Sequence, residues 1–127
     1  MPRPLPAQPA DAEDFFAGSP LGLAVFRRVN DLVIGLGGCD LRVAKTQVGW
    51  ARRRGFAVLW LPGRWLTAPA AEVVLTVYLT HPSASSRWKQ VVEVRPGLFA
   101  HHCEVHGVGD IDPEVEGWLA EAYRAAE

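Results

Sequence analysis

Residues 48–66 read VGWARRRGFAVLWLPGRWL, and this stretch decides the fold that the sequence predicts. Two apolar segments, 48–51 and 56–61, flank a basic turn at 52–55, and Pro62-Gly63 ends the second segment. Segments rich in β-branched and aromatic residues that are joined by a glycine-containing turn are typical of a β-hairpin. Because every residue from 56 to 61 is apolar, we expect this strand to lie at the centre of a sheet.

The composition predicts an ordinary globular protein. The chain has 127 residues, of which 49% are hydrophobic and 21% charged, and its net charge is −1. This length fits one domain with a real hydrophobic core. No apolar run reaches the roughly 18 residues of a membrane span, and no secretory pattern opens the chain, so we expect a cytoplasmic protein with no membrane partner. Cys39 and Cys103 are too few for a disulfide framework, which indicates reduced thiols.

A helix is predicted near each end of the domain. Ser19-Pro20 is a helix start, because serine caps a helix and proline fits its first turn. Apolar residues then recur at helical spacing as far as Leu36, and Gly37-Gly38 follow. Asp112-Pro113 starts the second helix in the same way, and its apolar stripe consists of Val115, Trp118, Leu119, Ala122 and Tyr123.

Further strands are predicted from alternation and turn residues. A short strand is expected at 41–43, a clearer one at 72–79, and a second hairpin at 90–94 and 98–106 across Pro96-Gly97. The order predicts an α+β fold, a mainly antiparallel sheet of about five to six strands with both helices packed on one face and the other face partly open. The core is expected to bury Val58, Leu75, Val77, Trp118 and Leu119 together.

The first fourteen residues differ in composition from the rest. Four of the first twelve residues are proline, and the segment has no apolar periodicity. We therefore expect residues 1–14 to be a disordered leader rich in proline and alanine, and residues 15–127 to form a single domain.

The charge is distributed unevenly along the chain. Residues 20–109 contain eleven Lys and Arg against five Asp and Glu, a net +6, whereas residues 110–127 carry −5. A basic body beside an acidic end suits a surface for nucleic acid or phosphate. It suits equally an acidic last helix that neutralises its basic neighbours, and the sequence leaves both interpretations open.

One functional hypothesis is a cytoplasmic, non-enzymatic module that binds nucleic acid as an accessory domain. Guanidinium groups pair with phosphates, and tryptophans stack on bases. The residues with this chemistry are Lys45, Arg52, Arg53, Arg54, Arg64, Trp65, Arg87, Trp88 and Lys89. No established nucleic-acid motif accompanies them, and a turn of three arginines also suits a solvated hairpin tip.

The alternative hypothesis uses the open face of the sheet. Here the chain is a small ligand-binding protein or an enzyme, with its site at Lys45, Gln47, Tyr78 and His102. A third interpretation is a homodimer whose open faces pair. A deep pocket of convergent polar groups would favour the ligand site, whereas a continuous basic stripe would favour nucleic acid.

The sequence points to no cofactor, metal or catalytic residue. His102, Glu104 and His106 share one side of a predicted strand, an arrangement seen in some metal sites, but no distant ligand accompanies them. The serines of residues 83–86 follow His81 in a polar loop without the G-x-S-x-G setting of a serine nucleophile. We therefore favour a non-enzymatic role and leave an enzymatic one open.

Several motifs together resemble a known family. They are VAKTQVGW at 43–50, the stretch RRRGFAVLWLPGRWL, His101-His102 and the closing GWLAEAYRAA. Over residues 15–126 the chain resembles a bacterial family, the domain of unknown function numbered 5655, which implies no particular activity. More distantly, the order of helix, lysine-bearing strand, hairpins and C-terminal helix resembles the MmcQ/YjbR-like fold. That likeness implies DNA binding by analogy of fold alone.

Overall fold

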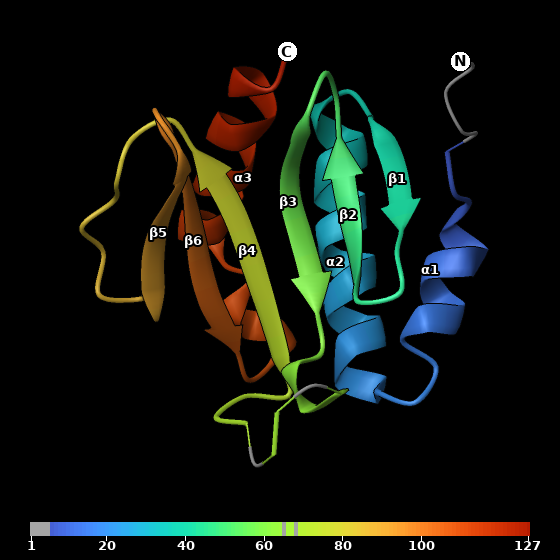
Figure 1. Cartoon of the computed structure of the whole chain (residues 1–127). Helices are drawn as coiled ribbons and strands as arrows, with labels where there is room; N and C mark the ends of the chain where they lie inside the picture. Colours follow the sequence, from blue (N-terminus) through green and yellow to red (C-terminus); the bar gives the residue numbers. More distant parts are fainter. Residues whose placement is uncertain (1–5, 65, 68) are drawn as a thin grey trace.

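The computed structural model describes residues 6–64, 66–67 and 69–127. Within this part of the chain an antiparallel sheet of six strands is accompanied by three α-helices (Figure 1). The elements in chain order are α1 (Pro9–Phe15), α2 (Pro20–Leu36), β1 (Asp40–Val43), β2 (Gln47–Ala51), β3 (Gly55–Trp60), the short 3₁₀ turn η1 (Pro62–Arg64), β4 (Val73–Leu79), β5 (Gln90–Arg95), β6 (Leu98–Val105), η2 (Val108–Asp110) and α3 (Pro113–Ala125). No described helix is long and apolar enough to cross a membrane.

The sheet grows outward from the predicted hairpin. Its strand order is β1-β2-β3-β4-β6-β5, and every neighbouring pair is antiparallel. In the hairpin, Val48 lies opposite Leu59, and a bulge between Trp50 and Ala51 shifts the register near the arginine turn. β3 therefore lies inside the sheet, as its apolar sequence predicts, and the α+β prediction is confirmed.

Both predicted helices begin at the expected residues. The Ser19 side chain accepts a hydrogen bond from the Gly22 N–H at 2.9 Å, and Asp112 accepts one from the Val115 N–H at 3.1 Å. Each cap is followed by a proline at the first helical positions, where no intrahelical donor is needed. The helices lie behind the sheet in Figure 1, so its other face is turned toward the viewer.

The end of α2 requires glycine. Gly37 has φ = 136°, a backbone conformation that favours glycine. A Cβ atom at this position would also lie 2.6 Å from the hydroxyl oxygen of Tyr123. That hydroxyl donates a 3.0 Å hydrogen bond to the carbonyl oxygen of Gly38, which joins α3 to the end of α2.

The core lies between the helices and one face of the sheet. Phe26 stacks on Phe16 and on Trp50, with ring centroids 5.8 Å apart in both pairs. Leu75, Val77 and Leu119 are fully buried, as predicted. The prediction was wrong for two residues. Val58 is buried on the opposite face, because it pairs with Thr76 and so points away from the helices, and Trp118 is half-buried.

The expected leader is partly structured. Residues 1–5 lie outside the described residues, but Pro9–Phe15 form α1, and Ala12 is fully buried. Proline is compatible with a first helical turn, and the Asp11 carboxylate accepts a hydrogen bond from the Gln8 N–H at 2.9 Å. The prediction of disorder was therefore wrong for residues 9–14. The proline-rich composition gave no sign of the short helix that packs on the core.

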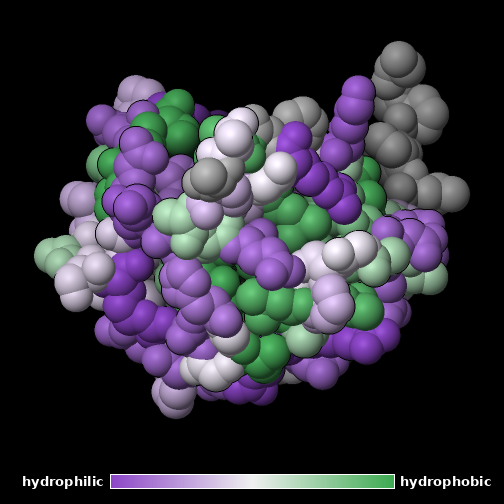
Figure 2. Space-filling model, turned by 90° about the horizontal axis from the view of Figure 1, so that it is seen from below, coloured by the Kyte–Doolittle hydropathy of each residue, from purple (hydrophilic) through white to green (hydrophobic). Residues whose placement is uncertain are grey.

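The segment between β3 and β4 lies at one end of the molecule, the lower end in Figure 1. Figure 2 views this end and shows hydrophobic residues near its centre with hydrophilic ones around them. Leu66, in the part of the segment that the structure describes, is 55% exposed.

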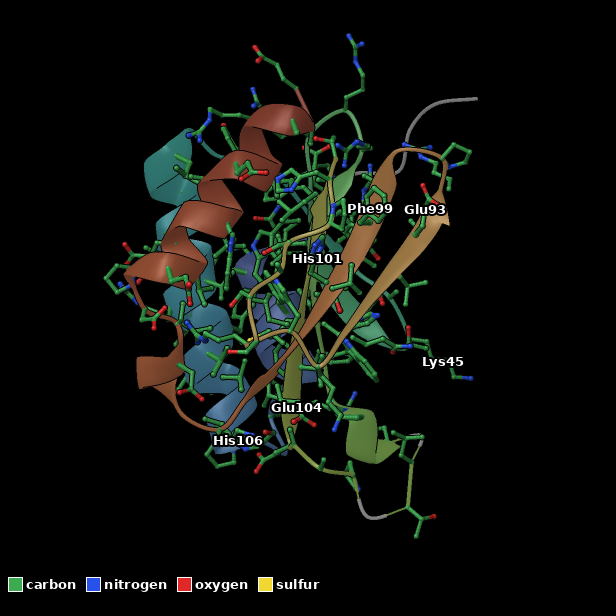
Figure 3. All side chains as sticks on the ribbon, turned by 90° about the vertical axis from the view of Figure 1, so that its left-hand side faces the viewer. Lys45, Glu93, Phe99, His101, Glu104 and His106 are labelled. Atoms are coloured by element: carbon green, nitrogen blue, oxygen red, sulfur yellow. The ribbon has the colours of Figure 1, made fainter. Side chains whose placement is uncertain are left out.

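His101 is a histidine held in the core by two hydrogen bonds. The Ser83 N–H donates to its Nε2 at 3.0 Å, so Nδ1 carries the proton and donates to the Phe99 carbonyl oxygen, also at 3.0 Å. His101 lies on the side of β6 that faces the helices (Figure 3). This arrangement fixes a neutral imidazole, and burial lowers the pKa of His101.

Removing a buried side chain from α3 should destabilise the protein. We expect Leu119→Ala to lower the free energy of unfolding by about 2–4 kcal/mol, because it leaves a cavity between α3 and the sheet. Urea denaturation monitored by circular dichroism measures the change. Ile34→Ala is the control, since Ile34 is 60% exposed, and its effect should stay within about 0.5 kcal/mol.

Stability should fall as the pH falls below about 6.5. The pKa of His101 is lower in the folded than in the unfolded protein. The neutral imidazole therefore stabilises the fold at pH values above the unfolded pKa. This stabilisation is lost as the pH falls from the unfolded pKa to the lower pKa of the folded protein. The loss for one histidine is at most about 1.4 kcal/mol per pH unit. Urea denaturation at pH 7.5 and 5.5 should show a smaller loss in His101→Leu than in the unchanged protein. His81, whose pKa is raised by Glu121, contributes in the opposite direction.

Candidate functional site on the open face of the sheet

The structure distributes the predicted basic residues over opposite ends of the sheet. The three arginines of residues 52–54 connect β2 to β3, whereas Lys45 lies in the turn before β2, at the other end of the hairpin. Lys45 is exposed and points away from the sheet in Figure 3, and Lys89 is exposed beside the first residue of β5.

Two of the predicted phosphate contacts are already engaged within the protein. Arg64 donates a 2.6 Å hydrogen bond to the Phe15 carbonyl oxygen, and its guanidinium lies 4.2 Å from the centre of that ring. Arg52 lies 4.0 Å above the ring of Tyr123 and donates to the same residue's carbonyl oxygen at 3.0 Å. Arg64 therefore joins η1 to α1, and Arg52 joins the turn between β2 and β3 to α3.

Arg87, another of the predicted basic residues, is close to α3. Arg87 donates to both carboxylate oxygens of Asp112, at 2.8 and 2.9 Å, and to Glu114 at 3.1 Å. Arg28 pairs with Glu116 in the same helix. The acidic helix therefore neutralises basic neighbours at these positions, which was one of the two interpretations of the charge pattern.

Trp88, the one predicted tryptophan that the structure describes, is not placed to stack on a base. Trp88 is buried, with its rings 4.1 Å from Trp118 and 4.9 Å from His101 between centroids. Its predicted role in base stacking was wrong, because the loop before β5 folds back onto α3. Trp65 lies outside the described residues.

The floor of the open face consists largely of small side chains. One row across the sheet places Gly49 between Arg42 of β1 and Val58 of β3, and Thr76 beyond Val58. Gly49 leaves space above the strand, and even a Cβ atom there would lie 3.2 Å from a methyl group of Val58. A glycine inside a strand often marks such a close approach. The result is a hollow of about 400 Å³ on this face.

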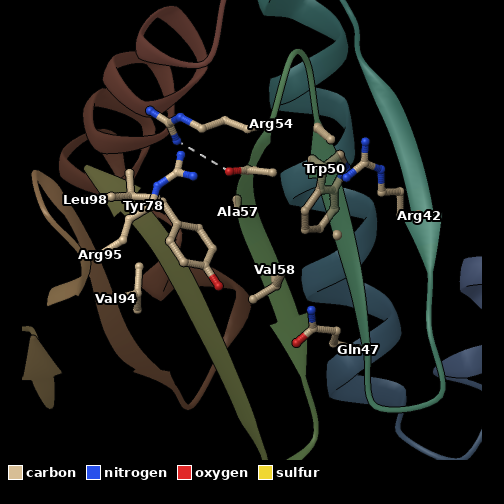
Figure 4. Close-up of a pocket in the computed structure, with 13 residues that line it drawn as sticks. Arg42, Gln47, Trp50, Arg54, Ala57, Val58, Tyr78, Val94, Arg95 and Leu98 are labelled. Carbon is tan, nitrogen blue, oxygen red and sulfur yellow. Dashed lines mark hydrogen bonds between the residues drawn. The ribbon is translucent and has the colours of Figure 1, made fainter. Parts of the chain in front are cut away.

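Three arginines line this hollow. Arg54 and Arg95 approach each other on one side, and Arg42 reaches in from the opposite side (Figure 4). Burial lowers the pKa of Arg54, and the positive charge of Arg95 lowers it further. Gln47 and Tyr78 supply further polar groups to the lining.

These three arginines differ from Arg27, Arg28 and Arg87, which pair with carboxylates. Among the described residues, no Asp or Glu lines the hollow, and no ion pair engages Arg42, Arg54 or Arg95. Within the described residues, Arg54 donates to two backbone carbonyl oxygens, of Ala125 at 3.3 Å and Gly55 at 3.5 Å. The hollow therefore presents guanidinium donors that an anion would satisfy.

Sequence reasoning identified only part of this cluster. Arg54 was among the predicted residues, but Arg42 and Arg95 were not. The alternation of Arg42 with its apolar neighbours Leu41 and Val43 does place it on the polar side of β1. No local signal indicates that residues 42 and 95, on strands at opposite edges of the sheet, line one hollow.

A second hollow of about 320 Å³ adjoins the first. Its lining residues are Thr46, Gln47, Val58, Trp60, Thr76, Tyr78 and His102, and it shares Gln47, Val58 and Tyr78 with the arginine-lined hollow. The structure thus brings together three of the four residues predicted for an open-face ligand site. The fourth, Lys45, does not line either hollow.

A chain of hydrogen bonds orders the second hollow. The Trp60 Nε1–H donates to the Thr76 hydroxyl oxygen at 3.2 Å, and that hydroxyl lies 2.7 Å from Nδ1 of His102. Because the indole can only donate, the hydroxyl proton is available to His102, whose Nε2 then carries the imidazole proton. Burial lowers the pKa of His102, which favours this neutral form.

The histidine strand offers no metal site within the described residues. No three His, Cys, Asp or Glu side chains in that part of the chain lie close enough to hold a metal ion together. Cys39 also has little reactivity at neutral pH, because burial raises the pKa of its thiol to about 11.

Comparison with known proteins gives one match. Residues 12–126 match the model of a family described as "Domain of unknown function (DUF5655)". No curated protein and no solved structure gives a significant match. The predicted resemblance to the numbered family is thereby confirmed, and the more distant likeness to the MmcQ/YjbR-like fold stays a prediction.

Removing a charge from the arginine-lined hollow should not destabilise the free protein. We expect Arg95→Gln to leave the free energy of unfolding unchanged or raise it by up to about 0.5 kcal/mol, because it removes repulsion from Arg54. The gain should be larger at low salt, where charges are screened less. Arg87→Gln is the matched control and should lower stability by roughly 0.2–1 kcal/mol. Equal losses in both variants, measured by urea denaturation, would mean that Arg95 has a structural partner.

Proposed function

The chain belongs to the DUF5655 family, and we propose that it is a small binding module that holds an anionic ligand on the open face of its sheet. The observation that supports this most strongly is the set Arg42, Arg54 and Arg95, which lines one hollow without a carboxylate among the described lining residues. Guanidinium groups carry their charge throughout the physiological pH range. Two guanidinium groups placed close together repel each other, and a bound anion offsets this repulsion.

The chemistry of the hollow fits a phosphate or carboxylate group. Arginine presents planar pairs of N–H donors that match two oxygens of such a group. The Gln47 amide and the Tyr78 hydroxyl, both half-buried in the lining, offer additional hydrogen bonds to the same ligand. A volume of about 400 Å³ lies within the range of small-ligand sites.

The arginine turn contributes one residue to this site. Arg54 lines the hollow, whereas Arg52 rests on Tyr123 and Arg53 is exposed outside the lining. A nucleic acid that used the hairpin tip would depend on all three side chains through its phosphates. Binding in the hollow depends on Arg54 and not on Arg53, so the two modes can be told apart.

Calorimetric titration with inorganic pyrophosphate at low salt tests the proposal. We expect binding that weakens as salt rises, and at least a tenfold loss of affinity in both Arg54→Gln and Arg95→Gln. Arg53→Gln is the matched control, because it removes the same charge from the same turn, and it should change the affinity by less than about twofold. Charge-assisted hydrogen bonds are worth about 1.5–3 kcal/mol, which is the basis for the tenfold threshold.

Two outcomes would contradict this proposal. Equal losses in Arg53→Gln and Arg54→Gln would indicate a general basic tip, and no binding at millimolar pyrophosphate would remove the anion site. Light scattering should accompany the titration to measure the oligomeric state of the free protein. A homodimer that paired two open faces would close the hollow to the anion.

A further inference from the structure

The second hollow lies between two aromatic side chains. Trp60 is on β3 opposite Val74, and Tyr78 lies four residues further along β4. At the rise of a β-strand this places the two aromatic positions roughly 13 Å apart along the sheet. Val58 and Thr76, which face each other between them, form the floor. The hollow is therefore a slot with aromatic walls and a floor of small side chains.

The slot has the chemistry to hold a planar ring. Trp60 and Tyr78 both line it, and stacking on aromatic side chains is a common way to hold a nucleic-acid base. The Trp60 N–H and the Thr76 hydroxyl are engaged with each other, which holds the indole in place. Gln47 and the Nε2–H of His102 remain to bond nitrogen and oxygen atoms at the edge of a ring.

The slot and the arginine-lined hollow adjoin each other. They share Gln47, Val58 and Tyr78, so a ligand that fills the slot extends past Tyr78 toward Arg54 and Arg95. We infer that the ligand is a nucleotide, with its base between Trp60 and Tyr78 and its phosphate at the arginines. This inference rests on the proposed function, because the phosphate is the anion proposed there. It applies to a free mononucleotide and to a nucleotide within a single strand alike.

The test compares ligands that differ only in the base. AMP, UMP and ribose 5-phosphate carry the same sugar phosphate, and only the first two carry a ring. We expect AMP or UMP to bind the full-length protein at least tenfold more tightly than ribose 5-phosphate in calorimetric titrations at low salt. In Trp60→Leu and in Tyr78→Leu, this ratio should fall below about threefold. The affinity for pyrophosphate should stay within twofold in Trp60→Leu, because Trp60 does not line the arginine-lined hollow.

Phe99→Leu is the matched control for these substitutions. Phe99 lies opposite Leu79, on the face of the sheet that the helices cover, so its ring is outside the slot. The ratio of affinities should be unchanged in this variant. If a slot variant fails to fold, nuclear magnetic resonance of the unchanged protein decides the question. AMP should then shift the Trp60 indole N–H signal more than ribose 5-phosphate does.

The outcomes separate this inference from the proposed function. Equal affinities for AMP, UMP and ribose 5-phosphate, with pyrophosphate still bound through Arg54 and Arg95, would overturn the base slot alone. No binding of any phosphate would overturn both. A 5′-phosphorylated single-stranded tetranucleotide identifies the source of the ligand. Tighter binding of the tetranucleotide than of AMP would support the slot as a site for single strands, and weaker binding would support it as a site for free nucleotides.

Discussion

Burial of one face of the sheet beneath α2 and α3 is the constraint on which the other features of this structure depend. Side chains of a β-strand alternate between faces, so the residues that pack against the helices determine which residues remain on the other side. Leu59, Leu75 and Cys103 lie in one buried row across three strands. The neighbouring row, with Val58 and Thr76, is thereby placed on the face that carries the two hollows.

Arginine has two different roles in this protein. Arg28 and Arg87 pair with carboxylates of α3, and Arg52 and Arg64 bond backbone carbonyl groups beside aromatic rings. These side chains join elements that are distant in the sequence. Arg54 also bonds a backbone carbonyl group of α3, but in the hollow its charge and that of Arg95 repel each other, which adds repulsion to the folded state. Such a cost at a solvent-accessible hollow suits a binding site better than a structural contact.

The same distinction applies to the aromatic residues. Trp50 and Trp88 belong to the interior, where Trp50 donates to the Asn30 side chain at 3.1 Å and Trp88 packs on Trp118. Trp60 and Tyr78 lie on the open face and are only half-buried. A basic and aromatic composition therefore did not identify the site, because most of its members stabilise the fold. The residues that line the two hollows lie together because alternate side chains of each strand point to the same face of the sheet.

The sequence by itself determined the features that depend on neighbouring residues. The hairpin around residues 52–54 and the helix starts at Ser19 and Asp112 follow from local periodicity, caps and turns. Only the tertiary structure decided which charges meet. Arg42 and Arg95 line one hollow because of non-local strand pairing, which no local pattern encodes. The helix at Pro9–Phe15 was missed for a related reason, since its stability comes from packing on the core and not from its own composition.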